Sequence, residues 1–324
     1  FSMRLIFTAA LFAATALPAA AETAVALSGD RTLLWIDTAT ATVTGKVDVQ
    51  GVDRLLGIDF RPGDKTVVGV TADHKIVVID YMTGATTEKA TMNTMLPSVD
   101  GPVVVDFNPA ADKLRFMTGT TNHRVNPDTG EVTVDGSLAY VAEDMYAGTA
   151  PNIVAAAYTN SYGKPEKTAM FNIDATISGL IQQTAPNDGT LAAIGKLGVA
   201  LEGPVAFDVA TSADGTNTAW LAANGGLHTV DLATGALTGS WMLTGADEPI
   251  RDLYILPAMY ATRRMSPGGR SSSATARILS QDRHAALDAL RRLNKGRDPG
   301  GILHAGGTFD ARGHIHLSRP GQPH

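Results

Sequence analysis

Residues 55–91 read LLGIDFRPGDKTVVGVTADHKIVVIDYMTGATTEKAT, and this segment carries the pattern from which the architecture follows. Short apolar or β-branched runs alternate in it with turn residues such as Pro62-Gly63 and Thr83-Gly84. Runs of this length, bounded by Pro, Gly and Asp, are typical of strands joined by tight turns. The segment therefore predicts four consecutive β-strands, at residues 56–60, 66–71, 75–80 and 86–91.

The same pattern returns along most of the chain. The first-strand motif GIDF (57–60) has four later echoes, whose starts follow one another at intervals of 45 to 51 residues. The echoes are VVDF (104–107), AAAY (155–158), AFDV (206–209) and RDLY (251–254). A period of 40–50 residues with about four strands per unit is the sequence pattern of a β-propeller.

The two ends of the repeat region complement each other. The chain enters with three strands, expected at 23–27, 32–37 and 42–49, and leaves with a single first strand at 251–256. One strand plus three makes a further blade, and pairing them leaves no open edge in the ring. We therefore predict an all-β protein, a β-propeller of five four-stranded blades closed by pairing of N- and C-terminal strands. A degenerate unit between residues 136 and 153 would make six blades instead.

The first 21 residues have the features of a signal peptide. Arg4 is their only charge, an apolar run extends from Leu5 to Leu17, and three alanines precede Glu22. Such a run with a small-residue cleavage site is typical of secretion, and it is shorter than the roughly 20 residues that span a bilayer. We expect a periplasmic or secreted protein with no transmembrane segment, whose propeller domain comprises residues 22–257.

Charge divides the remaining chain. Residues 22–259 contain 28 acidic and 14 basic residues, whereas residues 260–324 contain 11 basic and 4 acidic ones. An acidic propeller argues against nucleic acid as a partner. Residues 258–324 lack strand periodicity and are predicted to be a basic, mostly disordered tail with one helix over 280–293. A partner-binding tail and a read-through end without selected function both fit this break in composition.

Several motifs resemble a bacterial family of exported proteins, domain of unknown function 4394. The matching motifs are LLGIDFRP (55–62), VDFNPAADKLR (105–115), RVNPDTG (124–130), AAAYTNSY (155–162), PNDGTLAAIGKLG (186–198) and LHTVDLATG (227–235). The resemblance covers roughly residues 24–257. It implies an exported β-rich repeat domain, and it implies no particular activity.

Four aspartates occupy the same place in four of the five first strands. They are Asp59, Asp106, Asp208 and Asp252, and Ala157 takes this place in the fifth. Because first strands line the axial channel of a propeller, four carboxylates there could bind Ca²⁺, which takes several oxygen ligands. The alternative is that each carboxylate accepts backbone hydrogen bonds between blades, as buried polar groups require.

Other candidate motifs point to turns rather than to chemistry. Loops of the type Asp-x-x-Thr-Gly, at Asp80, Asp128 and Asp231, resemble ligand loops, but the turn chemistry of Asp and Gly accounts for them. The sequence has no Cys, which excludes disulfides and thiolate chemistry, and it has no G-x-S-x-G or H-E-x-x-H motif. We therefore predict no catalytic residue.

A binding rim is predicted at Tyr158, Asn160 and Tyr162, at the start of an insertion between two strands. Loops carry function more often than strands, and Tyr with Asn suits polar ligands such as glycans. The alternative is a long surface hairpin without a ligand.

These observations favour an exported, non-enzymatic binding or scaffold propeller that acts as a monomer on a protein or glycan partner. The alternative is a hydrolase or lyase with carboxylates at the channel mouth, because propellers support both roles. A carboxylate pair at catalytic distance would favour the enzyme, and an exposed aromatic rim would favour binding.

Overall fold

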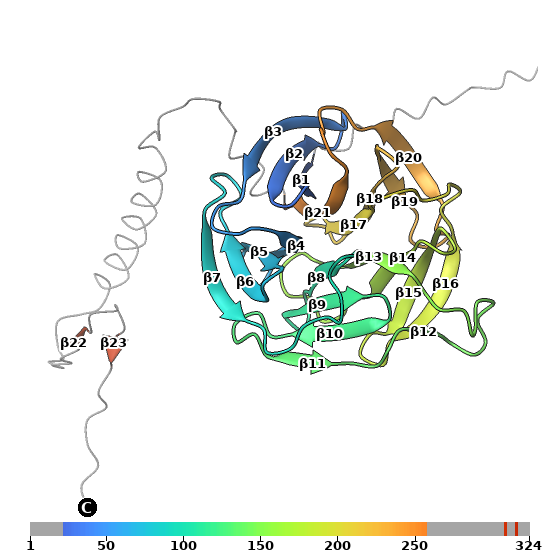
Figure 1. The fold of residues 1–324 in the computed structure, drawn as a ribbon, viewed down its shortest axis with the longest axis horizontal. Coiled ribbons are helices and arrows are strands. Elements are labelled where there is room, and N and C mark those ends of the chain that lie inside the picture. Colours follow the sequence, from blue (N-terminus) through green and yellow to red (C-terminus); the bar gives the residue numbers. More distant parts are fainter. Residues whose placement is uncertain (1–21, 258–307, 310–314, 317–324) are drawn as a thin grey trace, which may run out of the picture. The chain divides into compact units, whose positions relative to one another are not determined.

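The computed structural model describes residues 22–257, 308–309 and 315–316. Within 22–257 the chain forms five antiparallel sheets arranged in a ring, which confirms the predicted five-bladed β-propeller (Figure 1). The sixth-blade alternative is wrong. The segment between residues 136 and 153 instead supplies the short strand β12 (Ala139–Tyr140), which adds in parallel to the outer strand of one blade.

Each blade has four strands, named here from the axis outward, and blade III carries the short strand β12 in addition. Blade I comprises β4 (Leu55–Arg61), β5 (Thr66–Thr71), β6 (Lys75–Ile79) and β7 (Thr86–Thr91). Blade II comprises β8 (Val104–Asn108), β9 (Lys113–Thr118), β10 (Thr121–Val125) and β11 (Val132–Val134). Blade III comprises β13 (Ile153–Tyr158), β14 (Met170–Asp174), β15 (Gly179–Ala185) and β16 (Thr190–Lys196), with β12 outside β16. Blade IV comprises β17 (Ala206–Thr211), β18 (Asn217–Ala223), β19 (Gly226–Val230) and β20 (Leu237–Met242). Blade V comprises β21 (Ile250–Leu256), β1 (Thr23–Ser28), β2 (Thr32–Asp37) and β3 (Thr42–Asp48).

Blade V closes the ring as predicted. Its inner strand β21 pairs antiparallel with β1, from Thr23 opposite Leu256 to Leu27 opposite Asp252. The five inner strands then follow one another around the axis, each in contact with the next. The closure joins the two ends of the described chain segment in one sheet.

The core lies between the blades. Inner and second strands are buried on both faces, so β5 is a continuous run around Val67, Val68 and Val70 rather than an alternating pattern. One interblade cluster packs Val68 and Val70 of blade I against Phe107 and Phe116 of blade II. This burial explains why the first-strand motifs are so apolar.

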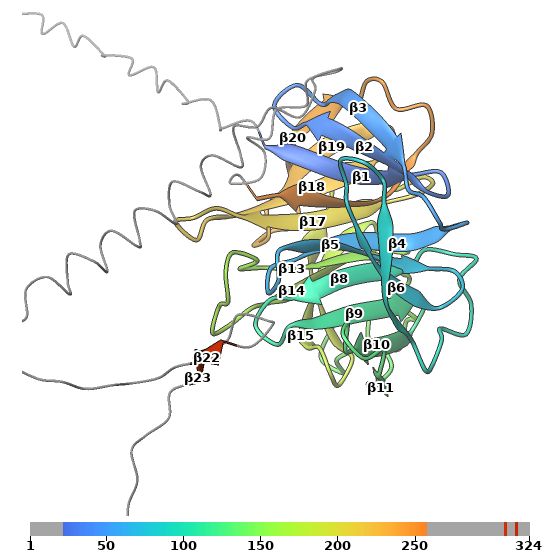
Figure 2. The same cartoon turned by 90° about the vertical axis from the view of Figure 1, so that its left-hand side faces the viewer.

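The ring has two faces, which Figure 2 shows from the side. We call "connector face" the one that carries the links between blades and the turns between second and third strands. The opposite "hairpin face" carries the turns between first and second and between third and fourth strands. The antiparallel order of the strands in every blade fixes this division.

The Thr-Gly turns on the hairpin face hold neighbouring blades together. Gly84 and Gly130 have positive φ, and a Cβ there would collide with the backbone of the preceding blade at Asp48 and Thr91 respectively. Glycine is therefore required both for conformation and for close approach. The predicted turn role of Asp128 is wrong, because the corresponding turn residue is Asn126, whose Oδ1 accepts the N–H of Asp128 at 3.1 Å.

Residues outside the propeller are described only in part. Thr308–Phe309 (β22) and Ile315–His316 (β23) form a two-stranded antiparallel sheet. The predicted signal peptide and the helix predicted at 280–293 lie outside the described residues. In the described part of the chain, no helix has the length and apolar character needed to cross a membrane.

Candidate functional site

The predicted aspartate series lies around the axis and bridges the blades. Asp59 accepts the N–H of Phe60 at 2.6 Å and that of Phe107, in the next blade, at 2.7 Å. Asp252 likewise accepts the N–H of its neighbour at 2.9 Å and that of Ile58 at 2.8 Å. These bonds are the ones that the structural alternative predicted.

The other two aspartates repeat the arrangement. Asp208 accepts the N–H of Val209 at 2.7 Å and that of Ile255, in blade V, at 2.5 Å. Asp106 accepts the N–H of Tyr158, in blade III, at 3.0 Å. Among the described residues no group of three or more His, Asp or Glu side chains is placed to hold a metal ion, so the calcium prediction gains no support from this geometry.

Burial changes the acidity of these carboxyl groups. Burial raises the pKa of Asp59, Asp106 and Asp252 well above the ordinary value, and the charges of the other axial aspartates contribute in the same direction. Burial raises the pKa of Asp208 to about 6. Each of these four axial carboxyl groups therefore binds its proton more tightly than an exposed aspartate does.

Blade III lacks the aspartate, and the insertion after β13 links it to blade IV instead. Asn160 donates its backbone N–H to Asn217 Oδ1 at 2.9 Å, and Asn217 Nδ2 donates to Asn160 Oδ1 at 2.9 Å. Ser161 N–H donates to Thr211 Oγ1 at 2.9 Å. Asn160 is thus engaged in joining two blades.

The predicted rim is not assembled. Tyr158 is only 2% exposed, and its hydroxyl accepts a hydrogen bond from Arg115 Nε at 3.2 Å, so its place on a ligand-binding rim is wrong. It is the last residue of a strand that is buried along its full length. Tyr162 is exposed on the hairpin face and remains a surface candidate.

The partner of Tyr158 belongs to a buried network that the sequence interpretation missed. Arg115 is 2% exposed, and its Nη1 donates to Asn122 Oδ1 and to Asp135 Oδ2, both at 2.8 Å. Its Nη2 donates to Asn187 Oδ1 at 3.0 Å. The network fastens blade II to blade III, and the only sequence indication was an arginine inside the apolar strand KLRFMT.

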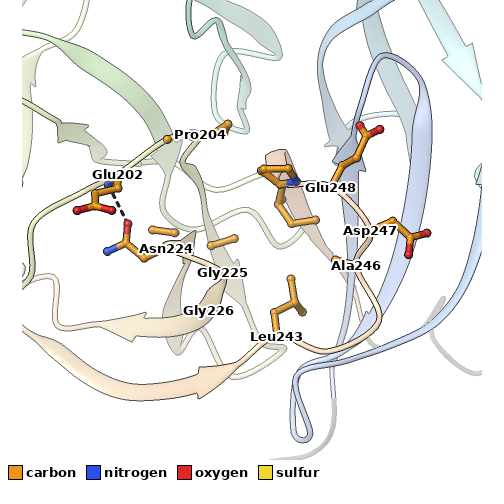
Figure 3. Close-up of a pocket in the computed structure, with 14 residues that line it drawn as sticks. Glu202, Pro204, Asn224, Gly225, Gly226, Leu243, Ala246, Asp247 and Glu248 are labelled. Atoms are coloured by element: carbon orange, nitrogen blue, oxygen red, sulfur yellow. Dashed lines mark hydrogen bonds between the residues drawn. The ribbon is translucent and has the colours of Figure 1, made fainter.

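A pocket of about 460 Å³ opens on the connector face between blades IV and V (Figure 3). Three segments far apart in sequence form it: residues 202–204, residues 222–226, and Leu243 with residues 246–250. They are the link that enters blade IV, the turn between its second and third strands, and the link that leaves it. The pocket therefore exists only once both blades are in place.

The interior of the pocket is apolar and its edge is acidic. Leu243 points inward beside Gly225 and Gly226, whereas the carboxylates of Glu202 and Glu248 stand at the edge and point away from the centre (Figure 3). Asn224 Oδ1 accepts the N–H of Glu202 at 2.8 Å, which fixes one wall to the other. The wall of the pocket is thereby held in place.

The pocket edge carries more negative than positive charge. Asp247 pairs with Lys46 at 2.9 Å, and both side chains are largely exposed. The carboxylate of Glu202 has no hydrogen-bond or ion-pair partner among the described residues. A second pocket, of about 360 Å³ between blades V and I, differs because its Lys75 is held by Asp73 and Glu88 at 3.4 and 3.3 Å.

Comparison with known families agrees with the motifs. A family model matches residues 32–253, a range that reaches every one of the five blades. The chain belongs to the family described as domain of unknown function (DUF4394). The family description assigns no activity to DUF4394 proteins, and none of the curated proteins matches this DUF4394 chain.

Two solved structures are similar to this DUF4394 chain, and both are of proteins of unknown function. One, from Bacteroides caccae, has a TM-score of 0.38 and 12% identity, with 71% of this chain and 77% of that chain covered. The other, from Bacteroides thetaiotaomicron VPI-5482, has a TM-score of 0.43 and 16% identity, with 73% and 67% covered. No activity passes from either protein to this one.

Proposed function

We propose that this protein is an exported, non-enzymatic propeller that binds a positively charged group in the connector-face pocket between blades IV and V. The observation that carries the proposal is the combination of an apolar interior with three carboxylates around it, those of Glu202, Asp247 and Glu248. The surrounding propeller adds an excess of 14 negative charges over residues 22–259. Such a field steers cations towards the surface and repels anions.

The chemistry of the pocket suits an amine on an aliphatic stem. The stem packs against Leu243 and Ala222, and each buried methylene contributes about 0.8 kcal/mol. The ammonium group then lies at the edge, within reach of Glu202 and Glu248 once these side chains rotate. Each such exposed ion pair adds about 0.2–1 kcal/mol.

The non-enzymatic part of the proposal rests on the axial carboxylates. The alternative, a hydrolase or lyase with carboxylates at the channel mouth, needs a carboxylate pair that faces its substrate. The four axial aspartates instead accept backbone hydrogen bonds within the ring, for example from Phe107 and Ile58. They hold neighbouring blades together and take no part in a chemical step.

Export is proposed from the sequence of residues 1–21. Cleavage before Glu22 would leave the backbone of β1 intact, since this strand begins at Thr23. Mass spectrometry of the protein from the periplasm or medium of its native source is expected to show an N-terminus at Glu22. An intact N-terminus in the cytoplasmic fraction would contradict export.

Isothermal titration of the full chain with pentylamine tests the binding site. The amine is expected to bind, and pentanoate, which has the opposite charge, is not. Replacing both Glu202→Gln and Glu248→Gln is expected to weaken pentylamine binding about 2- to 30-fold, because two exposed ion pairs are lost.

The matched control is Asp214→Asn, which removes an exposed charge on the hairpin face. Its side chain serves only the turn it belongs to, where Oδ1 accepts the N–H of Thr216. The control is expected to bind pentylamine as the natural chain does. Equal affinity in the double variant, or no binding of pentylamine at all, would overturn the proposed site.

A further inference from the structure

The outer strand of blade IV, β20, is an edge without the usual protection. In the described part of the chain it is the last strand of its sheet, and its six residues, LTGSWM, include no charged side chain. Natural sheets protect their edges with charged residues, with very short strands or with a covering segment, because an open edge pairs with other chains.

The outer strands of the other blades have such protection. Strand β3 carries Lys46 and Asp48, and β7 carries Glu88 and Lys89. Strand β11 is only three residues long, and β16 is covered by the parallel strand β12. The open edge is therefore a property of blade IV and not of the fold in general.

The open stretch has defined ends. Leu237 N–H donates to Leu197 O at 3.3 Å, and Thr244 N–H donates to Ala41 O at 3.0 Å, so the neighbouring blades hold the strand on either side. Between them, Leu243 N–H donates inward to the turn of its own blade. Because hydrogen bonds alternate along an antiparallel strand, the N–H groups of Ser240 and Met242 point outward.

Two large apolar side chains flank these groups. Met242 is 76% exposed and Trp241 is 40% exposed. The ring of Trp241 packs against Trp220, with 6.1 Å between centroids, and it lies over Gly239, where a Cβ would collide with it. The ring of Trp241 therefore has a defined position beside the outward-pointing N–H groups of β20.

We propose that β20 binds an extended segment of a basic partner polypeptide, which adds to blade IV as a further strand. Backbone pairing at Ser240 and Met242 provides the attachment, and Trp241 provides an apolar contact. A second copy of the same chain is disfavoured as the occupant because two acidic propellers repel each other. Leu243, which directly follows β20, lines the connector-face pocket, so a basic side chain of the segment reaches the carboxylates there. This last feature rests on the proposed function, whereas the strand pairing does not.

The test is selection of a random twelve-residue peptide library on the full chain and on two variants. Ser240→Pro removes one outward N–H and blocks pairing, and proline is tolerated at an edge. Ser240→Ala keeps the N–H and removes only the hydroxyl that contacts His228. Peptides rich in β-branched residues and containing Lys or Arg are expected from the natural chain and from Ser240→Ala. Their binding to Ser240→Pro is expected to be at least tenfold weaker.

Hydrogen exchange with the strongest peptide bound locates the contact. Slower exchange at Ser240 and Met242 is the expected result. Equal binding to Ser240→Pro, or no enriched peptide, would overturn the proposal. A natural chain that dimerises while Ser240→Pro stays monomeric would overturn it in favour of a second copy. Peptides that pair with β20 but need no basic residue would leave the strand pairing standing and remove the cationic contact of the proposed function.

Discussion

The buried aspartates at the propeller axis determine how the stability of this protein responds to pH. Burial raises the pKa of Asp208 from 3.8 to about 6, so the folded protein holds this proton more tightly than the unfolded chain does. The stabilisation is complete below pH 3.8 and is lost as the pH rises through about 6. Asp59, Asp106 and Asp252 act in the same direction because burial also raises the pKa of each.

Replacing Asp208→Asn is expected to flatten this dependence. The natural chain should lose about 2.4 kcal/mol of unfolding free energy from this one group between pH 4 and pH 7, at about 1.4 kcal/mol per pKa unit. The variant loses one acceptor for the N–H groups of Val209 and Ile255, so it is less stable throughout, but it varies less with pH. Urea unfolding across this range measures the difference. A slope equal to that of the natural chain would contradict the assignment.

Arg115 is the residue whose role was least visible in the sequence. Its strand motif marks it only as a charge among apolar residues, and its partners Asn122, Asp135 and Asn187 come from three other segments. Tyr158 was misplaced for a related reason. It ends a strand that is buried up to its last residue, and the sequence pattern does not show how far burial extends along that strand.

Arg115→Met is expected to cost about 3–5 kcal/mol of unfolding free energy, because it leaves the buried carboxylate of Asp135 without its main partner. Arg124→Gln is the matched control. Arg124 also contacts Asp135, at 3.1 Å, but its side chain is 34% exposed, so its loss is expected to cost less than about 1 kcal/mol. Urea unfolding of both variants decides the matter, and equal costs would contradict a special role for Arg115.

The turns on the hairpin face reverse the chain and also contact the preceding blade. The sequence predicts them correctly as turns, since Asp80 accepts the N–H of Met82 at 2.9 Å as such a loop requires. Their contact with the preceding blade could not be predicted, because it depends on the angle between blades and not on local residues. The misassignment of Asp128 has a different origin, because residues 126–130 read Asn-Pro-Asp-Thr-Gly and Asn126 therefore occupies the first position of the loop. The carboxylate of Asp128 instead pairs with Arg61 across the blade boundary at 2.8 Å.

Gly130→Ala tests the turn contact. It places a Cβ at a positive φ and against the backbone of Thr91, so we expect a loss of more than about 2 kcal/mol of unfolding free energy. Gly101→Ala is the control, since no atom lies within 4 Å of its Cβ position, and it should change stability by less than about 0.5 kcal/mol. Thermal or urea unfolding compares the two. Similar values would show that blade contact at this turn contributes little.

At the scale of the molecule, the ring closure was predictable and the pocket was not. The repeat region begins with three strands and ends with one, and together these four strands make up a fifth blade. In the structure β21 pairs with β1 as this count predicts. The pocket between blades IV and V combines residues near 203, 224 and 248, which only the folded ring brings together. No sequence motif identifies these links. Their proposed role in binding depends on acidic side chains that the folded ring places around an apolar space.

The most direct test of the binding role is a titration of the ¹⁵N-labelled full chain with pentylamine, followed by backbone amide shifts. The largest changes are expected at Gly225, Gly226 and Ala246, which line the connector-face pocket. Val52, in the second pocket, and Tyr162, on the hairpin face, are expected to be unaffected. Changes centred on those residues, or none anywhere, would contradict a cation-binding pocket between blades IV and V.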